Sequence, residues 1–155
     1  MFDLESIDLY QVMRALTDDE QGEHRWLFDT GTGQILLWTS SGGLSGTEPV
    51  PLEWLDVVPI DPLPPTIRRR DMIDFIRQVR DKDAAKRLTQ AITGAEAERR
   101  FRIVLHSYPA LAPVWDTFHE ARLLRHAIEW LAAHGLIHKA SAKQRIALIR
   151  EPLVP

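Results

Sequence analysis

The chain has 155 residues, of which 45% are hydrophobic and 26% are charged, a composition typical of one soluble globular domain. It contains no cysteine, which excludes disulfides, thiolate metal sites and cysteine nucleophiles. The net charge of −3 is divided unevenly, because residues 1–65 carry a net −10 and residues 66–155 a net +7. Such a division can mean that a basic surface binds nucleic acid or an acidic partner. It can also mean that the two oppositely charged halves complement each other, and we favour this interpretation.

The apolar runs of the sequence are short. None approaches the roughly 20 residues that a membrane-spanning helix needs. The N-terminal stretch MFDLESIDLYQ is acidic and lacks the basic region and apolar core of a secretory signal. We therefore expect a cytoplasmic protein without membrane contacts.

The N-terminal part predicts a helix followed by a hairpin. Residues 5–16 place apolar side chains at helical spacing, with Ser6 as the predicted N-cap. Two β-rich runs, 24–29 and 34–39, then flank Thr30-Gly31-Thr32-Gly33, whose glycines suit a tight turn. A phosphate-binding loop would need a helix after these glycines, whereas an apolar, strand-like run follows, so we predict a β-hairpin.

The chain changes character after a third predicted strand at residues 54–60. Residues 61–67 are a proline-rich connector that separates an acidic β-rich part, residues 1–60, from a basic helical part, residues 68–155. We expect the two parts to form one domain over residues 1–155.

Four helices are predicted after the connector. Their approximate ranges are 70–81, 81–94, 95–107 and 113–134, with Asp81 or Asp83 capping the second, Gly94 ending it and Gly135 ending the fourth. Residues 146–149 fit a last helical turn or a strand equally well. The predicted fold class is α+β: a short N-terminal helix, a small antiparallel β-sheet built on a hairpin, and a bundle of about four α-helices.

The stretch FHEARLLRH, residues 118–126, resembles a zinc-binding helix at first sight. A zincin helix needs histidines four residues apart, because only then do both reach one ion. His119 and His126 are seven apart, about 10.5 Å along a helix, and the cation of Arg122 lies between them. His134 and His138 have the right spacing, but Gly135 interrupts their helix. We predict no metal and no cofactor.

No local motif for acid–base or nucleophilic catalysis is present either. The sequence favours a non-enzymatic protein, although an enzyme whose catalytic residues converge from distant positions stays open.

Two arginine clusters dominate the basic part, one at 68–70 and one at 99–102. Arginine beside aromatic side chains is enriched in the energetically dominant residues of protein interfaces. We therefore predict a contact region for an unknown protein partner, formed by Arg99, Arg100, Arg102, Trp115 and Arg122. Nucleic-acid binding through the basic helices is the alternative, and a homo-oligomer stays open.

Several motifs occur in a familiar order. They are FDTGTGQILLW, DFIRQVRDKDAAKRLTQAITG, ERRFRIVL, WDTF and AIEWLAAHGLI, and together they span about residues 5–137. This pattern resembles a bacterial uncharacterised protein family, the one numbered zero-one-five-eight. The family's third-helix motif looks like A-F-R-R-F-K; Arg99, Arg100, Phe101 and Arg102 match its later part, and Glu98 replaces an aromatic residue. The resemblance implies a small cytoplasmic bacterial protein and no particular activity.

Overall fold

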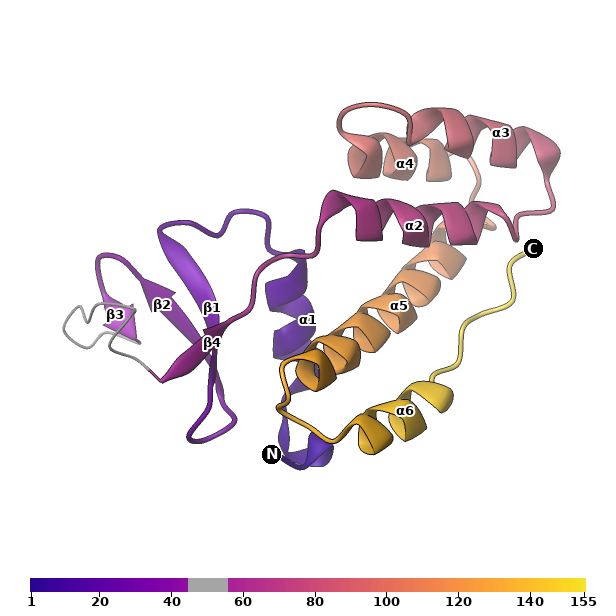
Figure 1. Cartoon of the computed structure of the whole chain (residues 1–155). Coiled ribbons are helices and arrows are strands. Elements are labelled where there is room, and N and C mark those ends of the chain that lie inside the picture. The colour runs from indigo at the N-terminus through magenta and orange to yellow at the C-terminus, as the bar shows by residue number, and fades with distance from the viewer. Residues whose placement is uncertain (45–55) are drawn as a thin grey trace. The chain divides into compact units, whose positions relative to one another are not determined.

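The computed structural model describes residues 1–44 and 56–155 (Figure 1). The elements follow one another as η1 (Leu4–Ser6), α1 (Leu9–Thr17), β1 (His24–Asp29), β2 (Ile35–Thr39), β3 (Gly43–Leu44), β4 (Val57–Pro59), α2 (Pro65–Ile76), α3 (Lys82–Ala91), α4 (Ala97–Leu105), α5 (Ala112–Ala133) and α6 (Lys139–Ala147). This order confirms the predicted α+β class, with a short N-terminal helix, a small antiparallel sheet and then helices.

The described residues form two compact units, and each has its own core. Unit 1 comprises residues 1–63 and 123–149, and unit 2 comprises residues 64–122 and 150–155. The assignment of residues 1–155 to one domain stays a prediction.

The predicted hairpin is present in unit 1 as β1 and β2 (Figure 1). The register pairs His24 with Thr39 and Phe28 with Ile35. Gly33 closes the turn with a positive φ of 76° and donates its N–H to the carbonyl of Asp29 over 2.8 Å. The four strands of the sheet are ordered β3-β2-β1-β4, and each neighbouring pair is antiparallel. The predicted third strand corresponds to β4, while Trp54 and Leu55 lie outside the described residues.

The N-terminal helix begins later than predicted. Asp8 is the N-cap of α1, and its carboxylate accepts the N–H of Gln11 over 3.3 Å. Ser6, the predicted cap, instead ends η1 and donates its hydroxyl to the carbonyl of Asp3. Aspartate and serine cap helices about equally well, so sequence spacing alone does not choose between them.

The core of unit 1 joins α1, the sheet, residues 123–133 of α5, and α6. Its most deeply buried side chains include Val12, Leu16, Phe28, Ile60, Ile128, Leu131 and Ile137. The loop between α5 and α6 turns at Gly135, whose φ is 67°. In the same loop, the carbonyl of Leu136 accepts the N–H of Phe2 over 2.8 Å.

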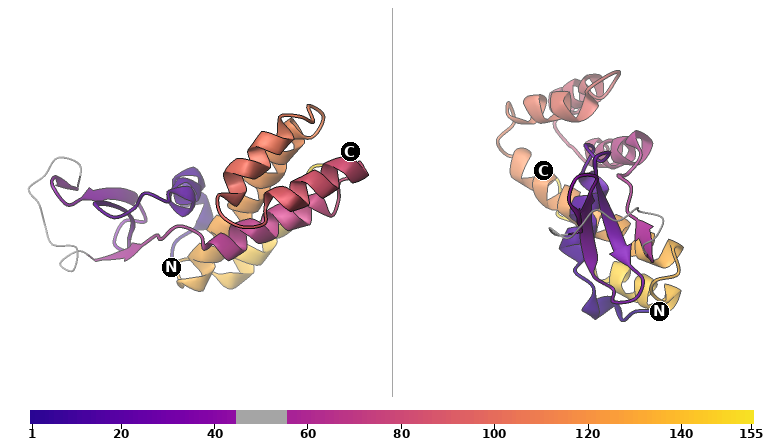
Figure 2. Two further views of the ribbon diagram at one scale, coloured as in Figure 1. Left: turned by 90° about the horizontal axis from the view of Figure 1, so that it is seen from above. Right: turned by 90° about the vertical axis from the view of Figure 1, so that its left-hand side faces the viewer.

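Unit 2 contains α2, α3, α4 and residues 112–122 of α5, and Figure 2 shows its helices from two further directions. Helix α2 begins at Pro65, within the stretch predicted as connector, because proline fits the first turn of a helix. The sequence allowed Asp81 or Asp83 as the cap of α3. In the structure Asp81 is the cap, and its carboxylate accepts the N–H groups of Asp83 and Ala84. The core of unit 2 is aromatic: the rings of Phe75, Phe101, Trp115 and Phe118 lie 4.7 to 6.3 Å apart by their centroids.

The tail that the sequence left open forms α6 and then an extended segment. Residues 150–155 belong to unit 2, where Val154 is buried and Arg80 donates its N–H to the carbonyl of Pro155 over 3.3 Å. None of the helices in the part of the chain that the structure describes combines the length and apolar composition needed to cross a bilayer.

Candidate functional site

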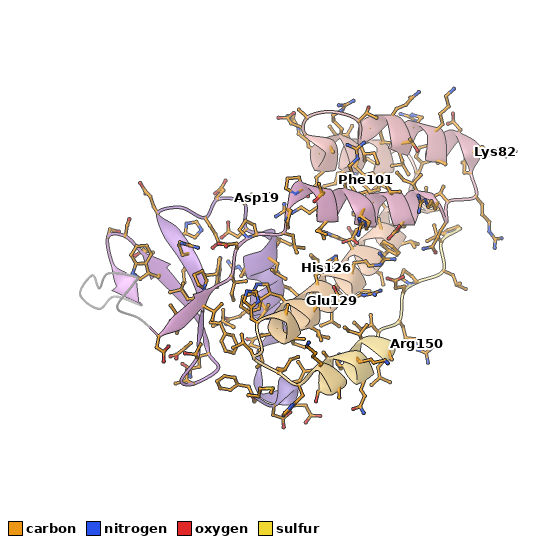
Figure 3. All side chains as sticks on the ribbon, viewed as in Figure 1. Asp19, Lys82, Phe101, His126, Glu129 and Arg150 are labelled. Atoms are coloured by element: carbon orange, nitrogen blue, oxygen red, sulfur yellow. The ribbon has the colours of Figure 1, made fainter. Side chains whose placement is uncertain are left out.

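Trp115, one of the five residues predicted to bind a partner, lies inside unit 2. Only 4% of its surface is exposed, and its ring meets Phe101 edge-on at 4.7 Å and Phe75 edge-on at 5.2 Å. Phe101 is seen on the side of α4 that faces α2 (Figure 3). Edge-to-face contacts of this kind add to the stabilisation from burial alone. Trp115 therefore holds α2, α4 and α5 together.

Arg100 also has an internal role. Its Nη1 donates to the carbonyls of Thr93 over 2.8 Å and Ala95 over 3.4 Å, and its Nη2 donates to the carbonyl of Gln90 over 3.4 Å. Carbonyls at the end of a helix have no partner within the helix. Arg100 thus closes the C-terminal end of α3 and the turn after it.

Arg122 is the centre of a charged cluster within unit 2. Its guanidinium contacts Asp74 at 2.7 Å and Asp71 at 3.4 Å, and it also hydrogen-bonds Glu151 of the C-terminal segment. The group lies over the ring of Phe118, 4.8 Å from its centroid. Burial alone would lower the pKa of Arg122, but its hydrogen bonds with Glu151 and Asp74 outweigh burial and raise the pKa.

Arg99 and Arg102 lie on the exposed side of α4. The side chain of Arg99 is 73% exposed and its contact with Glu96, at 3.5 Å, is a surface pair. Ile103 lies on the same side of the helix and is 58% exposed, which is unusual for an isoleucine. Of the five predicted residues, Arg102 and Trp115 line one hollow, which is described next. Arg100 and Arg122 each bind other groups of unit 2.

A small hollow opens between α2, α4 and α5 of unit 2, and we call it the arginine pocket. It is lined by Arg68, Met72, Glu98, Phe101, Arg102, Trp115 and His119 and has a volume of about 10 Å³. Arg68 contacts Glu98 across it at 3.4 Å, with 12% of the arginine side chain exposed. Such a volume holds about one water-sized group.

His119 forms one wall of the arginine pocket. Its imidazole stacks on the indole of Trp115, with the planes 10° apart and the centroids 4.9 Å apart. Burial, followed by the positive charge of Arg102, lowers the pKa of His119 below its usual 6.5. Both causes favour the neutral form of the ring. The sequence did not single out Arg68 or His119 as pocket residues, because they meet Trp115 only through the packing of three helices.

His126 has a separate environment on α5. Its Nδ1 lies 3.9 Å from a carboxylate oxygen of Glu129, and Arg125 donates to the other oxygen of that carboxylate over 2.8 Å (Figure 3). Within residues 1–44 and 56–155, no three His, Cys, Asp or Glu side chains gather closely enough to hold a metal ion.

A larger hollow lies in unit 1, between the N-terminal residues and α6, and we call it the acidic groove. It has a volume of about 560 Å³. Its buried side chains are Leu4 and Ile7; its charged side chains are Asp3, Glu5 and Asp8, which are exposed, and Arg145, which is partly buried. Three carboxylates against one arginine give these lining residues a net charge of −2.

Two large apolar side chains stand exposed at the acidic groove. Tyr10 is 71% exposed and Leu148 is 70% exposed, and both line it. Helix α1 buries Val12, Met13, Ala15 and Leu16, whereas Tyr10 on the same helix is exposed. Tyr10 lies two positions before the fully buried Val12, about 200° around the helix from it, and therefore points away from the core. Leu148 follows α6, whose existence the sequence left open.

The comparisons with known proteins agree on one family. The model of the family described as "Uncharacterised protein family (UPF0158)" matches residues 6–153. The chain is also similar to the "UPF0158 protein PA5073" of Pseudomonas aeruginosa strain PAO1, with 28% identity over 156 residues that cover 97% of this chain and 96% of that protein. No solved structure matches the chain significantly.

Proposed function

The chain belongs to the Uncharacterised protein family (UPF0158), and we propose that it acts as a non-enzymatic protein-interaction module of the cytoplasm. The observation that supports this proposal is the acidic groove, where Tyr10 and Leu148 are each at least 70% exposed. Contiguous exposed apolar surface rimmed by polar residues is typical of binding sites.

The partner that fits this groove is an amphipathic segment with basic side chains. The floor, from Leu4 and Ile7, would receive the apolar side of such a segment. The carboxylates of Asp3, Glu5 and Asp8 would attract its lysines or arginines. A neutral or acidic segment would gain only the apolar contact and would meet like charge at the rim.

The proposal can be tested with two designed helical peptides that share one apolar face and carry either lysine or glutamate on the other. We expect the basic peptide to bind the full-length chain, as measured by fluorescence anisotropy, and the acidic peptide to bind at least tenfold more weakly. Leu148→Glu should strongly weaken the binding of the basic peptide. Leu153→Glu is the matched control, because Leu153 is 95% exposed and does not line the groove. Equal binding by both peptides, or no effect of Leu148→Glu, would contradict the proposal.

The exposed side of α4 is a second proposed contact surface. Arg99 and Arg102 flank the exposed Ile103, a combination that suits an acidic protein partner. Arg100 and Arg122 would support this surface indirectly, because their guanidinium groups are engaged by carbonyls and carboxylates of unit 2. The double variant Arg99→Glu/Arg102→Glu should lose an acidic partner that the Arg70→Glu variant keeps.

Binding to nucleic acid would behave differently from both. Contacts with phosphates release counterions, so the affinity for DNA or RNA falls steeply with salt. We expect no measurable binding of a mixed DNA and RNA set at low salt. Salt-sensitive binding that Arg99→Glu/Arg102→Glu abolishes would instead favour a nucleic-acid-binding function.

A further inference from the structure

The arginine pocket gathers hydrogen-bond donors around a small space. Three of the residues that line it carry side-chain donors: Arg68 on α2, Arg102 on α4 and Trp115 on α5. Arginine has donors only, and the indole nitrogen likewise donates and does not accept. The acceptor chemistry at this pocket therefore comes from Glu98 and from the unprotonated nitrogen of His119.

Trp115 provides a second, independent observation. Its Nε1–H is buried and has no hydrogen-bond acceptor among the described residues. Buried polar groups of proteins are nearly always hydrogen-bonded, and each exception calls for a physical explanation. By contrast, the indole N–H of Trp26 in unit 1 donates to the carboxylate of Asp18 over 2.8 Å. Trp115, whose indole donor is unsatisfied, thus lines the same pocket as two arginines.

Glu98 stands at this pocket as a weakly held carboxylate. Its distance of 3.4 Å to Arg68 is at the long end for a charged hydrogen bond, and half of the Glu98 side chain is exposed. An exposed carboxylate with one long contact is easily replaced by another anion. The pocket's volume of about 10 Å³ limits what can enter to about one oxygen atom.

From these observations we propose that the arginine pocket binds an oxyanion, a carboxylate or a phosphate group, with one oxygen inside and the rest of the group at the mouth. Arg68 and Arg102 supply the positive charge, and Trp115 supplies a neutral N–H donor. Glu98 leaves Arg68 when the oxyanion arrives. The site is separate from the acidic groove, and it does not depend on the proposed protein partner.

The anion also changes the titration of His119. The charged groups around this imidazole are Arg102 and Glu98 on α4, Arg68 and Asp71 on α2, and Asp116 on α5 itself. Burial and Arg102 disfavour the imidazolium, so a bound anion that neutralises Arg102 removes one of the two causes. Binding should therefore raise the pKa of His119.

The test is a titration of the ¹⁵N-labelled full-length chain with inorganic phosphate and, separately, with acetate, at constant ionic strength maintained with chloride. The Trp115 indole N–H is assigned by side-chain resonance experiments, so no core substitution is needed. We expect its signal to shift in a saturable way while the Trp26 indole signal stays. A saturable shift with phosphate alone, with acetate alone or with both supports the proposal, and the pattern identifies which oxyanion the pocket prefers.

Three variants complete the test. Arg102→Gln should weaken binding about tenfold or more, because it removes a charged partner, and Glu98→Gln should strengthen it. Arg70→Gln is the matched control: it removes the same charge from an exposed position of α2, two residues from Arg68 and so on the opposite side of that helix. No saturable shift with either anion would overturn the proposal. An equal loss in Arg102→Gln and Arg70→Gln would also overturn it, because binding would then be a general charge effect.

Discussion

Replacing Arg122 by methionine is the sharpest test of how unit 2 is held together. Methionine keeps the length and apolar stem of the side chain but removes the guanidinium. Asp71, whose side chain is only 5% exposed, and Glu151 then lose their contacts with Arg122. Asp74 also loses Arg122 but keeps its pair with Arg77 at 4.0 Å. The substitution also removes the contact that Glu151 of the C-terminal segment makes with α5.

The expected cost follows from the exposure of each carboxylate. Removing one partner of a fully buried ion pair costs about 3–5 kcal/mol, because the remaining charge is left without compensation. Asp71 is close to that limit, whereas Asp74 and Glu151 are 28% and 33% exposed and are partly rehydrated. We therefore expect Arg122→Met to lower the free energy of unfolding by about 2–4 kcal/mol.

Urea unfolding followed by far-UV circular dichroism measures this loss. Arg125→Met is the matched control on the same helix, because its pair with Glu129 has both side chains about half exposed and should contribute only about 0.3–0.5 kcal/mol. Adding Asp71→Asn to Arg122→Met should recover part of the lost stability, since it removes the buried charge that has lost Arg122. If Arg122→Met costs no more than Arg125→Met, the cluster is a surface network and the reasoning is wrong.

Three further predictions concern single positions. The pKa of His119 measured by NMR should lie below 6.5. Because the pKa is lower in the folded than in the unfolded chain, the free energy of unfolding should rise with pH from the folded pKa up to about 6.5 and then stay level. A measured pKa at or above 6.5 would contradict the burial argument. Gly135→Ala should cost about 1 kcal/mol in thermal unfolding because of its φ of 67°, and Gly33→Ala should cost more, because a Cβ there would also lie 2.9 Å from the ring of Phe2; equal losses would refute the steric part. Asp81→Ala should cost about 1 kcal/mol as a lost helix cap, and an unchanged melting temperature would show that water replaces it.

The features that the sequence predicted well are local ones. The hairpin follows from two glycines between two β-rich runs, and the end of α5 follows from Gly135, whose φ is 67°. Two aspartates were candidates for the cap of α3, and Asp81 is the one that caps it. In each case the deciding interactions join residues within a few positions of one another, where spacing carries the information.

The surroundings of the predicted arginines depend on packing instead. Arg122 meets Asp71 and Asp74, about fifty positions earlier, and Glu151, 29 positions later. Arg100 turns back to carbonyls at the end of α3, which have no side-chain signature in the sequence. An arginine cluster in a sequence therefore shows where positive charge is concentrated, but not which of its members face solvent.

The division of charge along the chain leads to a final argument. Each ion pair described above joins residues of the same half: Arg122 with Asp71, Asp74 and Glu151, and Arg68 with Glu98, all lie within residues 66–155. These pairs leave the net −10 of residues 1–65 and the net +7 of residues 66–155 unchanged. The expectation that the halves complement each other gains no support from them. The two proposed sites use this remaining charge in opposite senses, since the acidic groove attracts a basic segment and the arginine pocket attracts an oxyanion.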